Sequence, residues 1–205
     1  MFYQTTISCR ILAKTYNKSI MKILIILLSL FIFHLKSDTD SNYQEELIIE
    51  IINKTMKNLK NTLQTALKDG NIVEAIKICS SQAQDLTMLN NTEKTSIKRI
   101  SLKYRNPANK PTKKEELILK SFEEKLQSGI EFNDLVFKQT ITNYKEKTFT
   151  YIKAIPVKEV CLNCHGDNVS KKVLKQIKIN YPNDKAIGFN LGEIRGAFSV
   201  RHTFN

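Results

Sequence analysis

The sequence predicts an α+β domain, with helices in its first part and an antiparallel sheet in its later part. Apolar residues recur at spacings of three and four up to about residue 127, which is typical of amphipathic helices. Beyond that point, β-branched and aromatic residues concentrate in short alternating segments, which is typical of strands. With 205 residues, 41% of them hydrophobic, the chain is long enough for one such domain and a targeting segment.

The first part of the domain is expected to contain long helices. One covers residues 41–67 and ends at Asp69-Gly70-Asn71, since glycine accepts the left-handed conformation of a helix stop. Another covers 72–86 and carries Cys79 on its apolar face. A third runs over 112–127, where Thr112 and Glu115 have the spacing of a capping box. The inner faces are expected to hold Ile48, Ile52, Met56, Leu59, Leu63 and Ala66 in the first helix, and Leu117, Ile118, Phe122 and Leu126 in the third.

The later part of the domain is expected to form the sheet. Alternation at 100–104 predicts a short strand, and segments 132–138 and 148–157 predict two antiparallel strands. A short helix is expected over 169–179. The C-terminal segment 196–204 has the clearest strand pattern, because Phe198, Val200, His202 and Phe204 fall on one side.

The N-terminal region has the pattern of an export signal. Met21-Lys22 precedes an apolar run at 23–35, which is short for a spanning helix of about 20 residues. A cleaved signal peptide and an uncleaved membrane anchor over 21–36 are both compatible with this pattern. We therefore expect an extension and signal over 1–37, one domain over 38–205 and a periplasmic location.

The charge of the chain points away from nucleic acid. The formal net charge is +12, but the basic residues beyond the signal are scattered and interleaved with Glu and Asp. No basic stripe with interleaved aromatic residues is present. A solvated basic surface is expected, which would favour an acidic partner or an anionic membrane surface.

One motif carries chemistry: Cys161-Leu162-Asn163-Cys164-His165 is C-x-x-C-H, the attachment sequence of c-type haem. Its two thiols, held in a tight turn, can add to the two vinyl groups of a porphyrin, and His165 then binds the iron. A redox-active C-x-x-C, a zinc site that includes Cys79, and a chance match are the alternatives. The export signal favours haem, because attachment takes place outside the cytoplasm. A single motif predicts a single haem.

The sixth iron ligand is open from the residues alone. The chain has four cysteines, and Cys9 precedes the signal, so Cys79 is the odd thiol of the exported part. It is a candidate ligand, but a buried free thiol and an intermolecular disulfide are alternatives. The other candidates are His202, Met56 and Met88, or no ligand at all; for Met56 and His202 a place in the core is the ordinary role. His34 lies in the signal.

Several segments resemble a family of periplasmic single-haem proteins that was long catalogued as a domain of unknown function. The similar segments are 181–189 and 192–200, Ala75-Ile76-Lys77-Ile78-Cys79 with Ala83, and Arg99-Ile100-Ser101 with 105–111. Together they cover about residues 45–203. The resemblance implies a PAS-like fold, a role as a sensor module of the kind found in histidine kinases and chemoreceptors, and Cys79 as the distal ligand. Phe189 and Glu193 depart from the family pattern, which has Tyr and Asp there.

The expected function follows from haem and export. Arg99, Arg105 and Arg195 are candidates to pair with haem propionates, with surface or structural charge as the alternative for each. We expect a redox or small-gas sensor, with a periplasmic electron carrier as the alternative. No distal His beside an Arg is evident, so an enzyme is not expected. Because no output domain follows Asn205, a sensor would need a signalling or redox partner protein, and a homodimer is open.

Overall fold

The structure is a computed structural model. It describes residues 4–69, 71–144 and 146–204, without the side chains of 4–19, 30–41 and 69. The side chains of Cys9 and His34, and much of the predicted signal segment, therefore lie outside the described residues. The chain divides into two units, Met1–Glu45 and Glu46–Asn205.

Helix α1 spans Gln4–Asp69 and is much longer than the helix predicted from residue 41. The physical reason is the absence of any glycine or proline before Gly70, so that nothing in the sequence interrupts the helix. In the first unit, the large apolar side chains of residues 20, 21 and 23–28 are exposed. Among the helices whose side chains are described, none combines the length and apolar character needed to cross a membrane.

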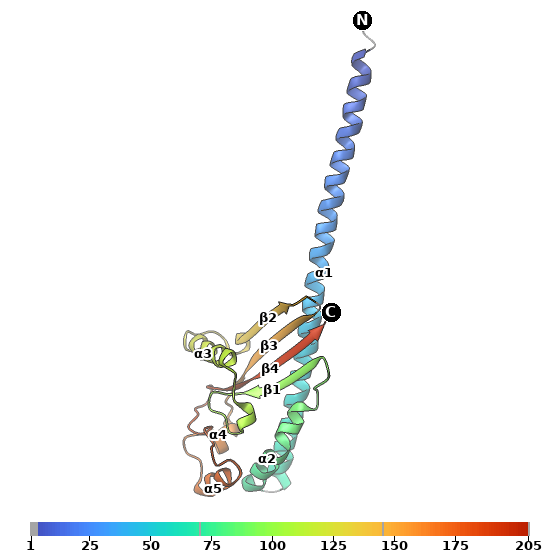
Figure 1. The fold of residues 1–205 in the computed structure, drawn as a ribbon. Coiled ribbons are helices and arrows are strands. Elements are labelled where there is room, and N and C mark those ends of the chain that lie inside the picture. The colour runs from blue at the N-terminus through green and yellow to red at the C-terminus, as the bar shows by residue number, and fades with distance from the viewer. Residues whose placement is uncertain (1–3, 70, 145, 205) are drawn as a thin grey trace. The chain divides into compact units, whose positions relative to one another are not determined.

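The sheet consists of β1 (Thr95–Ile100), β2 (Val136–Thr142), β3 (Lys147–Pro156) and β4 (Ile194–Phe204). All neighbouring strands are antiparallel and the order is β1-β4-β3-β2 (Figure 1). The strand predicted at the C-terminus is present as β4, which lies between β1 and β3, and its residues Gly196–Val200 are buried in an unbroken run. The strand predicted at 100–104 is wrong: β1 ends at Ile100, where the predicted strand begins, and pairs with β4 at Ile97–Val200.

Both faces of the sheet are covered, which divides the core into two layers. The residues of the first layer come from α1 and one face of the sheet, and they are Ile48, Ile52, Ile97, Phe149, Tyr151, Phe198 and Val200. The second lies on the opposite face against helix α3 (Lys113–Gln127), and it contains Ile100, Ile118, Leu119, Phe122, Leu135, Ile152, Ala154, Ile194 and Ala197. The α+β, PAS-like fold class is therefore confirmed: helices pack on an antiparallel sheet.

Details of the helix faces differ from the predictions. The capping box of α3 is present, because Thr112 accepts from the Glu115 backbone and Glu115 accepts from the Thr112 backbone. Leu117, however, is 68% exposed, and Leu119 is buried in its place. The buried face of α3 contains Glu115 and the residues three, four and seven positions after it, which are Ile118, Leu119 and Phe122. In α1, Met56 is likewise exposed and the neighbouring Thr55 is buried, where its hydroxyl accepts from the Asn90 amide.

The remaining helices gather near one end of the sheet (Figure 1). They are α2 (Ile72–Met88), α4 (Glu159–His165) and α5 (Lys171–Asn180), with single 3-10 turns at Pro107–Asn109 and Phe132–Asp134. Ile76 of α2 packs against Val173 and Ile177 of α5. The Asn180 amide at the end of α5 donates to the Ser80 hydroxyl of α2 at 2.8 Å. The C-x-x-C-H motif forms α4, a short helix rather than only a turn, and so lies beside α2 and α5.

Candidate functional site

The two motif cysteines lie three positions apart on α4, and each packs into a different apolar cluster. Cys161 contacts the cluster of Val157, Ala186 and Phe189. Cys164 contacts the cluster that joins α2 to α5. Both are free, half-buried thiols. Burial raises the pKa of Cys164, although the charge of Arg105 acts in the opposite direction.

The carbonyl groups at the C-terminal end of α4 are held by distant parts of the chain. Arg105 Nη2 donates to the Cys164 carbonyl at 2.7 Å, the Phe189 amide donates to the His165 carbonyl at 2.9 Å, and the Gly188 amide donates to the Gly166 carbonyl at 2.9 Å. These bonds fix a helix end that would otherwise lack partners. Gly166 itself is required by close approach, because a Cβ there would lie 2.8 Å from the Leu162 carbonyl oxygen.

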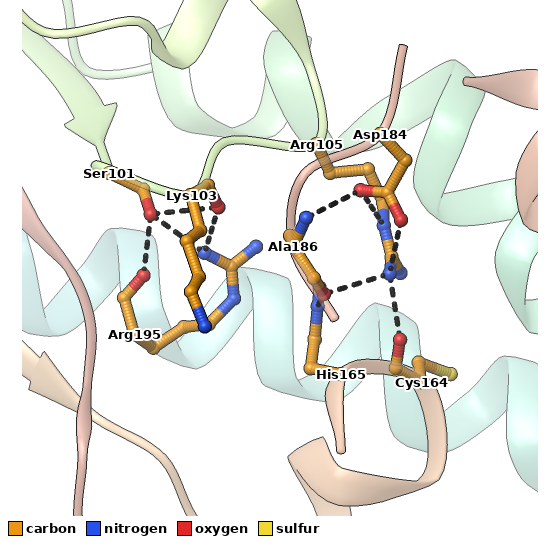
Figure 2. Close-up of polar contacts among 8 residues, drawn as sticks. All are labelled: Ser101, Lys103, Arg105, Cys164, His165, Asp184, Ala186 and Arg195. Atoms are coloured by element: carbon orange, nitrogen blue, oxygen red, sulfur yellow. Dashed lines mark hydrogen bonds and ion pairs between the residues drawn. The ribbon is translucent and has the colours of Figure 1, made fainter. Parts of the chain in front are cut away.

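His165 is presented in the form that a metal ligand needs. Its Nδ1 lies 2.6 Å from the Ala186 carbonyl oxygen, which can only accept, so Nδ1 carries the proton and Nε2 keeps its lone pair (Figure 2). Burial, followed by the charges of Arg195 and Arg105, lowers the pKa of His165 well below 6.5. The imidazole is therefore neutral at physiological pH, with one nitrogen available for coordination.

Arg105 makes a buried ion pair with Asp184 next to the histidine. Its Nε donates to Asp184 Oδ1 at 3.0 Å, and its Nη2 donates to Asp184 Oδ2 and to the Ala186 carbonyl, each at 3.1 Å (Figure 2). Asp184 Oδ1 also accepts from the Ala186 amide at 3.0 Å. Asp184 was not predicted as a site residue, but it is the acidic residue of the 181–189 segment, and that was the available signal.

Arg195 and Arg99 lie near the same histidine but have different partners. Arg195 Nη1 donates to the Ser101 hydroxyl at 3.1 Å and to the Lys103 carbonyl at 3.3 Å (Figure 2). Burial, then the charges of Arg105 and Arg99, lowers the pKa of Arg195 to about 10. Arg99 Nη2 donates to the Ala83 carbonyl at 3.2 Å, whereas its buried Nε has no partner among the described residues.

Cys79 lies on α2 beside this group. It is half-buried, and burial raises the pKa of its thiol while the charges of Arg99 and Arg105 lower it. Its neighbours on the helix connect it to the site: Ile76 shares a cluster with Cys164, and the Ala83 carbonyl accepts from Arg99. The structure therefore brings Cys79 to the side of the motif.

Comparison with known proteins places the chain in a family. The family model described as Tll0287-like matches residues 34–202. The chain belongs to the Tll0287-like family. One solved structure, the cyanobacterial haem protein Tll0287, is 22% identical, and the match covers 73% of this chain and 90% of that chain with a TM-score of 0.47. Among curated proteins, no significant match is found.

The other candidate ligands of this Tll0287-like chain are placed elsewhere. His202 lies seven residues beyond Arg195 on β4, about 23 Å along a strand that rises about 3.3 Å per residue. There its Nδ1 is 2.7 Å from the Thr95 hydroxyl, and its ring stacks on Phe204. Met56 and Met88 are both exposed. Within the described residues, no three His, Cys, Asp or Glu side chains gather closely enough to hold a metal ion by themselves.

The charges around His165 test whether haem fits the site. Arg99, Arg105 and Arg195 all act electrostatically on His165, so three guanidinium groups lie near one imidazole. In the part of the chain that the structure describes, Asp184 pairs with Arg105, while Arg99 and Arg195 have no ion pair. Buried cations without counter-charges are costly, which favours an anionic ligand here. Haem, with two propionates, has the matching charge.

Proposed function

We propose that the chain is an exported c-type haem protein with one covalently bound haem, acting as a redox or small-gas sensor module. Cys161 and Cys164 would hold the porphyrin by two thioether bonds, and His165 would bind the iron through Nε2. Bound there, haem would supply a one-electron couple and a coordination position that a small ligand can enter. The family is named after a protein described as a haem protein, which supports this cofactor.

One observation carries the proposal: the contacts of His165 suit an iron ligand. The Ala186 carbonyl engages Nδ1, which leaves Nε2 as the free donor, and two thiols lie within four residues on the same short helix. A structural histidine would normally use both nitrogens, as a buried polar group needs partners. Arg99 and Arg195 add the positive charge that propionates would neutralise.

Cys79 is our proposed sixth ligand. Its half-buried thiol interacts electrostatically with Cys164, and burial raises its pKa, but ferric iron would favour the thiolate. A thiolate donates electron density and would lower the potential, which suits a sensor better than an ordinary electron carrier with a Met ligand.

A sensor needs an element that can move, and α2 is the candidate. A groove of about 450 Å³ lies between the C-terminal part of α1 and α2, lined by Asn61, Thr62, Thr65, Ala66, Glu74, Ile78 and Gln82. Packing between these helices is therefore incomplete at a point one residue from Cys79. A change in what Cys79 binds would act on α2. The groove beside α2 would give the helix room to shift.

The export and partner assignments belong to the same proposal. We propose a periplasmic location, with the apolar segment of 21–36 as a signal or anchor, because its side chains at 23–28 are exposed. The output would pass to a signalling or redox partner protein, and a homodimer is one form that such a pairing would take. No enzymatic turnover and no nucleic-acid binding are expected.

Covalent attachment is the decisive test. Protein from cells that attach haem outside the cytoplasm should keep its colour after denaturation and acid–organic extraction. The double variant Cys161→Ala, Cys164→Ala should lose it under the same treatment. Haem that extracts from the wild-type protein would contradict the proposal. A redox titration with spectra in both oxidation states then distinguishes a sensor from an electron carrier. A high potential, together with the charge-transfer band of a Met-ligated haem iron, would favour the electron carrier.

A further inference from the structure

We infer that Arg105 and Asp184 form a positioning pair for His165: together they hold the Ala186 carbonyl that fixes which imidazole nitrogen faces the cofactor. Of the two roles that the sequence leaves open for Arg105, this assigns it structural pairing rather than contact with a haem propionate. The inference rests on the proposed function, in which His165 binds iron through Nε2. The observations behind it, however, are hydrogen bonds between protein groups around Ala186, which do not involve haem.

The guanidinium of Arg105 is already engaged by groups of the protein. Asp184 takes Nε and Nη2 in a two-pronged ion pair, and both side chains are almost wholly buried, at 11% and 9% exposure. The same Nη2 also lies within hydrogen-bond distance of the Cys164 and Ala186 carbonyls, so that its two hydrogens are shared among three acceptors. A planar fork of donors suits this set of acceptors, which a lysine ammonium would not match.

Ala186 is held at both of its backbone polar groups. Its amide donates to Asp184 Oδ1 at 3.0 Å, and its carbonyl accepts from Arg105 Nη2 at 3.1 Å. The peptide groups on either side of Ala186 are therefore oriented by one ion pair. The same carbonyl accepts from His165 Nδ1 at 2.6 Å, so the imidazole takes its direction from a peptide that the pair has fixed (Figure 2).

The segment that carries Ala186 is itself bonded to two distant parts of the chain. Asp184 closes a turn by donating its amide to the Tyr181 carbonyl, and Lys185 donates its amide to the Tyr104 carbonyl, next to Arg105 in sequence. The 181–189 segment is thus fixed to the loop of Arg105 and, through Gly188 and Phe189, to the end of α4. Within this segment, the ion pair supplies the side-chain contacts that orient the peptide groups of Ala186, and loss of either charged partner would remove that orientation from the carbonyl that His165 contacts.

The two partners have opposite charges, and this makes the inference testable. An effect of charge alone would shift the midpoint potential of bound haem down in Arg105→Gln and up in Asp184→Asn. Loss of positioning would instead have the same effect in both variants, because in each of them the His165 imidazole would populate more than one orientation. If Arg105 and Asp184 affected only folding, a folded variant would show neither opposite shifts in potential nor a second orientation of His165.

The experiment uses the full chain, first without haem, labelled with 15N-histidine and measured by NMR, with His165 assigned through His165→Gln. In the wild type, His165 should show only the Nδ1–H tautomer. Arg105→Gln and Asp184→Asn should both show a mixture of tautomers, Arg105→Lys a smaller admixture, and the exposed control Arg201→Gln none. Circular dichroism identifies the folded variants, and Arg105→Lys serves if the others fail to fold.

The haem-loaded protein supplies the second readout. Both variants should broaden the low-spin ferric electron paramagnetic resonance signal relative to wild type and Arg201→Gln. A His165 that stays wholly in the Nδ1–H tautomer in the folded variants, with potentials that move in opposite directions, would overturn the inference. If the wild type binds no haem, the proposed function fails, but the tautomer measurement still decides the role of the pair.

Discussion

Glu115 offers the sharpest quantitative prediction about the stability of the domain. Its carboxylate is buried between α3 and the sheet, where Oε1 accepts from the Ser199 hydroxyl at 2.8 Å. Oε2 accepts from Lys98 Nζ at 2.8 Å and from the Thr112 amide at 2.9 Å. One side chain therefore joins the N-terminus of α3 to β1 and β4.

The perturbation is Glu115→Ala, and its cost follows from the groups that it leaves behind. A buried donor that loses its acceptor costs about 1–3 kcal/mol, which applies to the Ser199 hydroxyl. The lost half of the capping box adds about 1 kcal/mol, whereas the partly exposed Lys98 adds less than about 1 kcal/mol. We expect about 3 kcal/mol in total, which corresponds to about 6–12 °C in the melting temperature of a domain of this size.

Thermal and denaturant unfolding of the full chain measures this loss. Glu116→Ala is the matched control, because Glu116 is the next residue of the same helix and its ion pair with Lys120 is exposed. The control should unfold like the wild type. A Glu115→Ala variant that unfolds within about 1 kcal/mol of this control would refute the reasoning, since the buried contacts would then contribute almost nothing.

The same carboxylate gives a pH dependence with a defined sign. Burial by itself raises the pKa of Glu115, but hydrogen bonds from Lys98, Thr112 and Ser199 outweigh it and leave the pKa below its ordinary value. The stabilisation is therefore present above the unfolded pKa of about 4.3 and is lost as the pH falls through the lower folded pKa. Glu115→Gln should flatten this part of the profile, because its amide can occupy the site without titrating.

Three further predictions concern the cofactor and the location. Cys79→Ala should still attach haem, but its ferric spectrum should shift from low spin toward high spin and its potential should rise; a spectrum equal to wild type would leave Cys79 as a core residue. Arg99→Gln should lower the fraction of haem-loaded protein more than Arg201→Gln does, measured by absorbance per protein, because the unpartnered Nε of Arg99 is buried; equal loading would remove it as a propionate partner. A reporter fused after Asn205 should be active only outside the cytoplasm, and cytoplasmic activity would contradict both export and covalent haem.

Features that depend on neighbouring residues could be predicted from the sequence. The C-x-x-C-H spacing, the Thr112–Glu115 capping box and the alternation of β4 involve partners within a few positions, so that the pattern itself contains the interaction. The helical first part and the late sheet are predictable for the same reason. The end of α1 near Gly70 was predicted, whereas its start was not: the helix extends well before the boundary predicted at residue 41, and no Gly or Pro interrupts it there.

Only the tertiary structure decided which side chains meet. Segment 95–100 became a strand because it pairs with β4, about a hundred residues away, and His202 found its partner in Thr95 across the same pair. Arg105 carries a charge that the sequence places near the motif only by resemblance. Its partners Asp184 and the Ala186 carbonyl lie about 80 residues further along the chain. Such contacts depend on how the sheet and loops pack, and no local periodicity encodes them.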